Sequence, residues 1–187
     1  MANRIRKVAM AAAIVGAVLA PRVASAAEGT SPALLADPGA HLRPTTLALA
    51  SLVERATRES STFSEIVRTI EDSDTYVYVM EGECGHGVRA CFTGVTIAGA
   101  RRIMRVTVSL DSSQPDWYVI GSIGHELHHT VEAINDPTVR STAAQYFLYE
   151  RIGFKGTAHS HETRAAMDAG NAVRAEIRRF ARSGKSE

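Results

Sequence analysis

Three residues in the second half of the chain carry the clearest chemical signal. His125, Glu126 and His129 form the pattern His-Glu-x-x-His within residues 121–130. Residues four apart on a helix lie on one face about a turn apart, so both imidazoles can reach one metal ion. Glu126 lies off that face, where its carboxylate can take a proton from a water molecule in an open coordination position. Two nitrogen ligands beside a carboxylate favour one Zn²⁺ per chain over Mg²⁺ or Ca²⁺.

The residues around this motif have the spacing of an amphipathic helix. Apolar side chains recur at intervals of three and four, namely Ile120, Ile123, Leu127, Val131 and Ile134. On a helical wheel they cluster opposite His125 and His129, so one face of the helix can pack into a core while the other lines a site. The alternative interpretation is a solvated helix face that carries two histidines and binds no metal.

A catalytic zinc ion usually has three protein ligands, so a third ligand must come from elsewhere in the chain. Glu162 is preferred, because it heads the apolar stripe of an expected last helix and a partly buried carboxylate needs a partner. The competing interpretation of Glu162 is an exposed carboxylate at a helix start. Glu132 lies about 10 Å beyond the turn of His125 at 1.5 Å per residue, and is better suited to support the site. The ligand alternatives left open are Glu132, His159 and His161.

The elements that must position these residues predict an α+β fold. Runs of β-branched and aromatic residues indicate strands near 76–80, 88–97 and 102–110. We expect them to form a small antiparallel sheet of about three strands, packed on helices. Helices are expected at 45–59, from about 61 to 70, from Pro115 through the motif to Asn135, at 138–152 and at 161–182. The motif helix is therefore followed by two C-terminal helices.

Residues 1–26 have the pattern of a secretory signal peptide. Basic residues precede an apolar run at 8–20, and the small residues 24–26 offer a cleavage site. The run is shorter than the roughly 20 residues of a membrane span. We therefore expect export to the periplasm or the extracellular space, with no stable membrane anchor after cleavage, and the alternative is a retained anchor. Residues 27–44 are expected to be an extended lead-in, and residues 45–187 a single domain.

The charge of the expected mature chain argues against a nucleic-acid partner. Removal of residues 1–26 takes away four basic residues and no acidic one, and leaves seventeen basic side chains against twenty acidic ones. The resulting formal charge of −3 comes without any run of like charges. Neither a nucleic acid nor an anionic membrane surface would find a basic patch in such a sequence.

The two cysteines of the chain, Cys84 and Cys91, lie in one short stretch that also contains glycines. In an exported protein, a pair this close predicts a disulfide that closes a small loop. The alternative is a metal site with His86 between the two cysteines. The six intervening residues exceed the two to four that are usual in zinc hairpins, so the disulfide is preferred.

The order of these features resembles the zincin metallopeptidases, in which a small sheet precedes a His-Glu-x-x-His helix. More narrowly, the chain is similar to the gluzincin branch, whose third zinc ligand is a glutamate from a later helix. The resemblance spans roughly residues 102–180 and implies three zinc ligands and a general base, which map to His125, His129, Glu162 and Glu126. Many gluzincins also carry an acidic residue four positions after the third ligand. This chain has Ala166 there, and the group that orients His125 is unidentified.

The resemblance implies an exported zinc metallopeptidase that hydrolyses a peptide or protein substrate. Glu126 would take a proton from water and deliver it to the leaving amine, and a further donor would stabilise the developing oxyanion. The donor alternatives are His159, His161, Tyr146 and Tyr149. Strand 102–110, if it forms a sheet edge, offers its backbone to an extended peptide.

Two other functions are compatible with the same sequence. One is a zinc-binding or interaction protein on a zincin-like scaffold that catalyses nothing. The other is hydrolysis of a non-protein amide, such as a peptide cross-link of a cell wall. Substitution of Glu126 by Gln separates the first from an enzyme, and the choice of substrate separates the second. The oligomeric state does not follow from the sequence.

Overall fold

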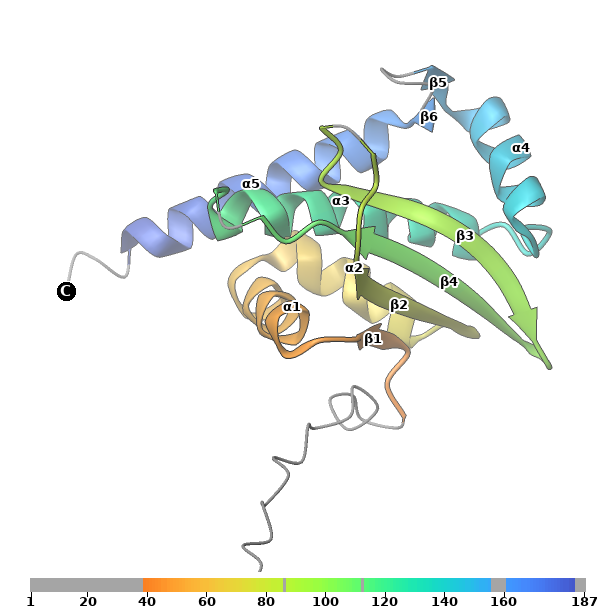
Figure 1. Cartoon of the computed structure of the whole chain (residues 1–187), viewed down its shortest axis with the longest axis horizontal. Coiled ribbons are helices and arrows are strands. Elements are labelled where there is room, and N and C mark those ends of the chain that lie inside the picture. The colour runs from red at the N-terminus through yellow and green to blue at the C-terminus, as the bar shows by residue number, and fades with distance from the viewer. Residues whose placement is uncertain (1–38, 86, 112, 156–160, 184–187) are drawn as a thin grey trace, which may run out of the picture.

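The computed structural model describes residues 39–85, 87–111, 113–155 and 161–183 (Figure 1). The elements in chain order are β1 (Leu42–Pro44), α1 (Leu47–Glu59), α2 (Ser61–Glu71), β2 (Thr75–Glu81), β3 (Ala90–Ala98), β4 (Arg101–Val108), α3 (Asp116–Ile134), α4 (Thr142–Ile152), β5 (Phe154–Lys155), β6 (His161–Glu162) and α5 (Arg164–Ser183). The α+β class predicted from the sequence is confirmed. The predicted signal peptide, most of the predicted lead-in and His159 lie outside the described residues.

The main sheet differs from the predicted one, because it has four strands and is mixed rather than antiparallel. Its strand order is β1-β2-β4-β3, with a second, two-stranded antiparallel sheet formed by β5 and β6. β2 runs parallel to both β1 and β4, whereas β3 is antiparallel to β4. The short turn at 99–100 closes a hairpin of β3 and β4, and the longer connection at 82–89 lets β4 lie between β2 and β3. Local strand patterns do not reveal such an order.

The sheet edge beside the motif helix is β3, and not the predicted strand 102–110. β4, which occupies that stretch, is paired on both sides, with β2 and with β3. Its backbone is therefore unavailable to another chain. In Figure 1, β3 runs along α3, and it contacts both α3 and α4, the latter near Phe92 and Val95 in the middle of the strand. An extended ligand can pair only with β3 on this side of the sheet.

The motif helix α3 is packed on two sides. It contacts β3 and β4 on one side and α5 on the other, and its buried residues include Ile120, Ile123 and Leu127, in agreement with the apolar spacing of the sequence. α5 packs closely on α3 at Gly170, where an added Cβ atom would lie 2.9 Å from Cβ of His125. Because real Cβ atoms do not approach so closely, Gly170 sets the distance between α5 and the motif.

Arg102 holds the carboxyl end of α3 against the sheet. Its guanidinium is buried and donates hydrogen bonds of 3.0–3.2 Å to the backbone carbonyls of Ala133, Ile134 and Asp136. Carbonyls at the end of a helix lack an intrahelical partner, and the last turn of α3 has no basic residue of its own. A 3.0 Å ion pair with Asp74 holds the guanidinium in turn. The sheet thereby fixes the position of the motif helix.

The predicted disulfide between Cys84 and Cys91 is present, with Cα atoms 5.8 Å apart. It closes the connection between β2 and β3, so neither sulfur is free to bind a metal ion. Within the described residues, no helix is long and apolar enough to cross a membrane.

Candidate metal centre

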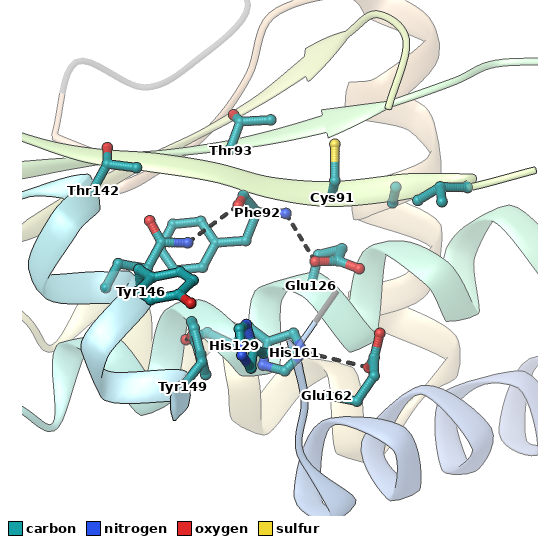
Figure 2. A pocket seen from close by; sticks show the side chains of 13 residues that line it. Cys91, Phe92, Thr93, Glu126, His129, Thr142, Tyr146, Tyr149, His161 and Glu162 are labelled. Atoms are coloured by element: carbon teal, nitrogen blue, oxygen red, sulfur yellow. Dashed lines mark hydrogen bonds and ion pairs between the residues drawn. The ribbon is translucent and has the colours of Figure 1, made fainter. Parts of the chain in front are cut away.

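Two elements bring together the three residues that the sequence predicts as metal ligands. His125 and His129 lie one turn apart on α3, and Glu162 reaches them from β6. Nε2 of His125 is 2.9 Å from Oε2 of Glu162, and Nε2 of His129 is 3.8 Å from the same oxygen. Figure 2 shows the carboxylate of Glu162 beside His129. The three ligand atoms lie within 4.8 Å of one another, so the group can hold a metal ion.

Glu162 lies in a short strand, and not on the last helix where the sequence analysis placed it. Oγ1 of Thr163 accepts a hydrogen bond from the backbone N–H of Ala166 at 3.1 Å, which is how threonine caps the start of a helix. α5 consequently begins at Arg164. The extended backbone before the cap lets the Glu162 side chain point across to α3, where 27% of it is exposed.

A buried nitrogen indicates that the donor set fits an ion. His129 is 4% exposed, and its Nε2 atom has no hydrogen-bond partner among the described residues. A buried polar atom without a partner costs free energy, and a bound metal ion would remove that cost. A tetrahedral ion with ligands at about 2.1 Å separates its ligand atoms by roughly 3.4 Å. The distances of 2.9 and 3.8 Å to Glu162 lie on either side of that value.

The other ring nitrogen of His129 is held by a carboxylate. Nδ1 of His129 is 2.8 Å from Oε2 of Glu132, and Oε1 of Glu132 accepts a 2.6 Å hydrogen bond from the hydroxyl of Thr163. A carboxylate in this position fixes the tautomer and the orientation of a metal-binding histidine. Glu132 therefore supports His129, as the sequence analysis preferred. Sequence reasoning missed Thr163, which also ties β6 to α3.

Three carboxylates, from Glu126, Glu132 and Glu162, surround the two imidazoles. Burial disfavours the charged form of His129, but the adjacent carboxylates of Glu132 and Glu162 outweigh burial and raise its pKa to about 9. The adjacent imidazoles of His125 and His129 lower the pKa of Glu162. Burial alone would raise the pKa of Glu132, yet hydrogen bonds from His129 and Thr163 lower it. Negative charge thus gathers in a partly buried place, which favours a bound cation.

Glu126 is held by the backbone of the edge strand. Its Oε2 accepts a 2.8 Å hydrogen bond from the N–H of Phe92 (Figure 2), while its Oε1 lies 3.8 Å from Nε2 of His125. One oxygen is fixed, and the other is turned to the ligand atoms. Burial raises the pKa of Glu126, against the charges of His129 and His125. Sequence reasoning missed Phe92, because a backbone donor leaves no mark on the residue type.

A cavity of about 350 Å³ opens beside this cluster, between β3 and α4 (Figure 2). Its volume lies in the range of roughly 300–1,000 Å³ that is usual for ligand sites. Its walls include Val88, Ala90, Phe92, Glu126, His129, Gln145, Tyr146, Tyr149, His161 and Glu162. A ligand in this cavity would contact both the edge strand and the possible metal ligands.

The predicted oxyanion donors occupy different positions around the cavity. The hydroxyl of Tyr149 donates to the backbone carbonyl of His129 at 2.6 Å, and burial raises its pKa, so this hydroxyl braces α3. Tyr146 donates to Oε1 of Glu150 at 3.1 Å, and Nε2 of His161 lies 2.5 Å from the same oxygen. Tyr146 and His161 therefore stand side by side at the cavity wall, whereas His159 lies outside the described residues.

Comparison of the chain with protein-family models, with curated proteins and with solved structures finds no match. The function of the site is therefore inferred from its geometry and chemistry.

Proposed function

We propose that this protein is an exported zinc metallopeptidase, with one zinc ion bound by His125, His129 and Glu162. The observation that carries the proposal is the convergence of these three ligand atoms, within 4.8 Å, at a buried nitrogen that has no other described partner. Two imidazoles and one carboxylate are the ligand set of a catalytic zinc site with an open position. Mg²⁺ and Ca²⁺ prefer oxygen ligands alone. When bound, zinc supplies Lewis acidity, which polarises a carbonyl and acidifies water.

Glu126 is the proposed general base. Its Oε1 is turned to the ligand atoms and takes the proton of the attacking water, while the N–H of Phe92 keeps Oε2 in place. Burial raises the pKa of Glu126, which makes this carboxylate a better proton acceptor than an exposed one. The same oxygen then delivers the proton to the leaving amine.

The substrate is proposed to be a peptide or protein. An extended peptide can use the edge of β3, because main-chain hydrogen bonds to an exposed strand hold any sequence in an extended form. Tyr146 and His161, at the opposite wall of the cavity, are the proposed donors to the oxyanion, for which they must turn from Oε1 of Glu150. The resemblance of the motif and of Glu162 to the gluzincin pattern supports the same function.

Substitution of Glu126 tests the proposal. The zinc-loaded chain and its Glu126→Gln variant are incubated with a mixed peptide library, products are identified by mass spectrometry, and zinc per chain is measured in parallel. We expect the variant to keep its zinc and to lose roughly 10²–10⁴-fold in rate. Glu65→Gln, at an exposed position of α2, is the matched control and should be unchanged. Equal rates in wild type and Glu126→Gln would exclude the general base, and zinc binding without any turnover would favour a non-catalytic protein.

A further inference from the structure

The outer edge of β3 has hydrogen-bonding groups that no strand uses. β3 is the last strand of the sheet, and the carbonyl of Arg89 accepts from the N–H of Ser109 at 2.8 Å on the β4 side. Because directions alternate along a strand, the groups of Ala90 and Phe92 point outward. A bulge between Phe92 and Gly94 shifts this alternation.

From the carbonyl of Phe92 onward, side chains of α4 occupy this edge. Nε2 of Gln145 donates to that carbonyl at 3.2 Å, and Oγ1 of Thr142 lies 3.3 Å from the nitrogen and 3.5 Å from the oxygen of Val95. The helix is so close that a Cβ atom at Gly94 would lie 2.8 Å from Oγ1 of Thr142. No peptide can add to this part of β3 without displacing α4.

The other part of the edge is different. Ala90 lines the cavity, and no side chain of the described part of the chain hydrogen-bonds to its backbone. The N–H of Phe92, bonded to Glu126, separates the two parts. Ala90 is 4% exposed, so a peptide reaches this part of β3 only from within the cavity, and it meets α4 on the other side of the metal centre.

Strand direction and charge decide which end of the peptide meets α4. Antiparallel pairing is the more stable and more frequent kind, and a chain antiparallel to β3 runs from α4 toward Ala90, with its amino end at α4. The described lining residues of the cavity include no Lys or Arg, and its two carboxylates, Glu126 and Glu162, are the proposed general base and zinc ligand. The carboxylate left for an amino terminus is that of Glu150 on α4, which contacts the lining residues Tyr146 and His161, and it suits an ammonium group and opposes a terminal carboxylate.

We propose that the site removes residues from the amino terminus of a peptide, an inference that rests on the proposed peptidase function. Because α4 occupies the edge from the carbonyl of Phe92, directly beyond the N–H that meets Glu126, no more than about one or two residues, at about 3.3 Å each, fit on the amino side of the cleaved bond. The residues on the carboxyl side lie along Ala90. Hydrolysis gives the hydroxyl of water to the acyl carbon and a proton to the amine, so the products are a short amino-terminal fragment and the shortened peptide.

Peptides that share one sequence and differ only at their ends test this proposal. A peptide with both ends free, an N-acetylated one and a C-amidated one are incubated with the zinc-loaded full chain, and products are identified by mass spectrometry over time. We expect fragments of one or two residues from the amino end, a loss of at least about 10-fold on acetylation, because an ionic hydrogen bond is removed, and little change on amidation. Cleavage of internal bonds at a rate insensitive to acetylation, or release from the carboxyl end, would overturn the proposal while leaving the peptidase function intact.

Binding without turnover provides a second readout. The ¹⁵N-labelled, zinc-loaded Glu126→Gln chain is titrated with the free and the acetylated peptide, and backbone amide shifts are followed by NMR. We expect the Ala90 amide to shift and the Val95 amide to stay, with weaker binding after acetylation. If the variant shows these shifts but the wild-type protein cleaves no peptide, recognition of the amino end would stand and the peptidase function would be rejected. Equal shifts at Ala90 and Val95 would contradict the proposal that α4 closes the edge of β3 beyond Phe92.

A variant of Gln145 changes only the part of the β3 edge that α4 occupies. Gln145→Ala frees the carbonyl of Phe92, so we expect the rate on the acetylated peptide to rise relative to that on the free one. Gln114→Ala, at an exposed position before α3, is the matched control. If Gln145→Ala leaves the ratio of the rates on the acetylated and the free peptide unchanged, α4 does not limit the amino side of the site.

Discussion

Two carboxylates of the C-terminal segment, Glu162 and Glu176, reach across to neighbouring helices and meet different groups. Glu176, on α5, accepts hydrogen bonds at the start of α2 from the hydroxyls of Ser60, Ser61 and Thr62 and from the N–H of Thr62, at 2.5–3.4 Å. Glu162 meets two imidazoles at 2.9 and 3.8 Å. Both carboxylates are partly shielded from solvent, and each lines a cavity, of about 350 Å³ at Glu162 and about 500 Å³ at Glu176.

The difference lies in how the surrounding polar atoms are used. Around Glu176 every partner is a hydrogen donor, and the contact completes the start of a helix, where backbone N–H groups lack intrahelical partners. Beside Glu162, the buried Nε2 of His129 has no hydrogen-bond partner among the described residues. A cluster whose polar atoms are all hydrogen-bonded stabilises the fold, whereas a cluster with a buried nitrogen that lacks a hydrogen-bond partner is suited to bind a ligand.

The largest expected difference between Glu162 and Glu176 is their effect on the stabilisation of the fold by zinc. At zinc concentrations of about 1,000 times Kd, binding adds roughly 4 kcal/mol to the free energy of unfolding, which raises Tm by roughly 8–16 °C. We expect this rise in wild type and in Glu176→Gln, and its loss in Glu162→Gln. Thermal unfolding followed by circular dichroism, with and without a chelator, measures it. A rise that survives in Glu162→Gln would place the metal elsewhere.

A smaller effect is expected at Glu132, which supports the site without joining it. Glu132→Gln removes the carboxylate charge that lies beside Nδ1 of His129, so zinc affinity should fall by about 10–100-fold. Competition with a chromophoric chelator measures the affinity, and Glu65→Gln serves as the control. Unchanged affinity in Glu132→Gln would show that the 2.8 Å contact with His129 has no influence on the metal.

The smallest effect is expected from Glu176, and it should depend on pH. Burial opposes its ionisation, but hydrogen bonds from Ser60 and Thr62 outweigh burial and lower its pKa below 4.5. A carboxylate with a lowered pKa stabilises the fold above the unfolded value and loses this contribution as pH falls through the folded value. Glu176→Gln should therefore lower the free energy of unfolding by about 1 kcal/mol at pH 7, and by less at pH 3. Urea unfolding at both pH values measures the difference, and a constant difference would exclude a contribution from charge.

The sequence predicts the parts of this site that depend on residue type and helical spacing. The two histidines and Glu126 follow from one turn of helix, and Glu162 follows from a polar residue at the head of an apolar stripe. The disulfide follows from two close cysteines. These features need only local geometry, which residue type and spacing encode directly.

The rest depends on contacts between distant segments. The place of β4 between β2 and β3 is set by which strands pair, and no local pattern records it. The hold of Phe92 on Glu126 uses a backbone N–H, which any residue except proline has. Thr163 follows β6 and caps α5. The backbone of Glu162 is therefore extended, although the helical spacing of apolar residues in the sequence includes this position.

Metal content tests the central claim most directly. The full chain, Glu162→Ala and Glu176→Ala are purified without chelator, incubated with zinc, freed of excess by gel filtration and analysed by plasma mass spectrometry. A bound zinc ion at His125, His129 and Glu162 predicts about one zinc per chain in wild type and Glu176→Ala, and a clear loss in Glu162→Ala. Equal zinc in Glu162→Ala and wild type, or no zinc in wild type, would contradict the proposed centre.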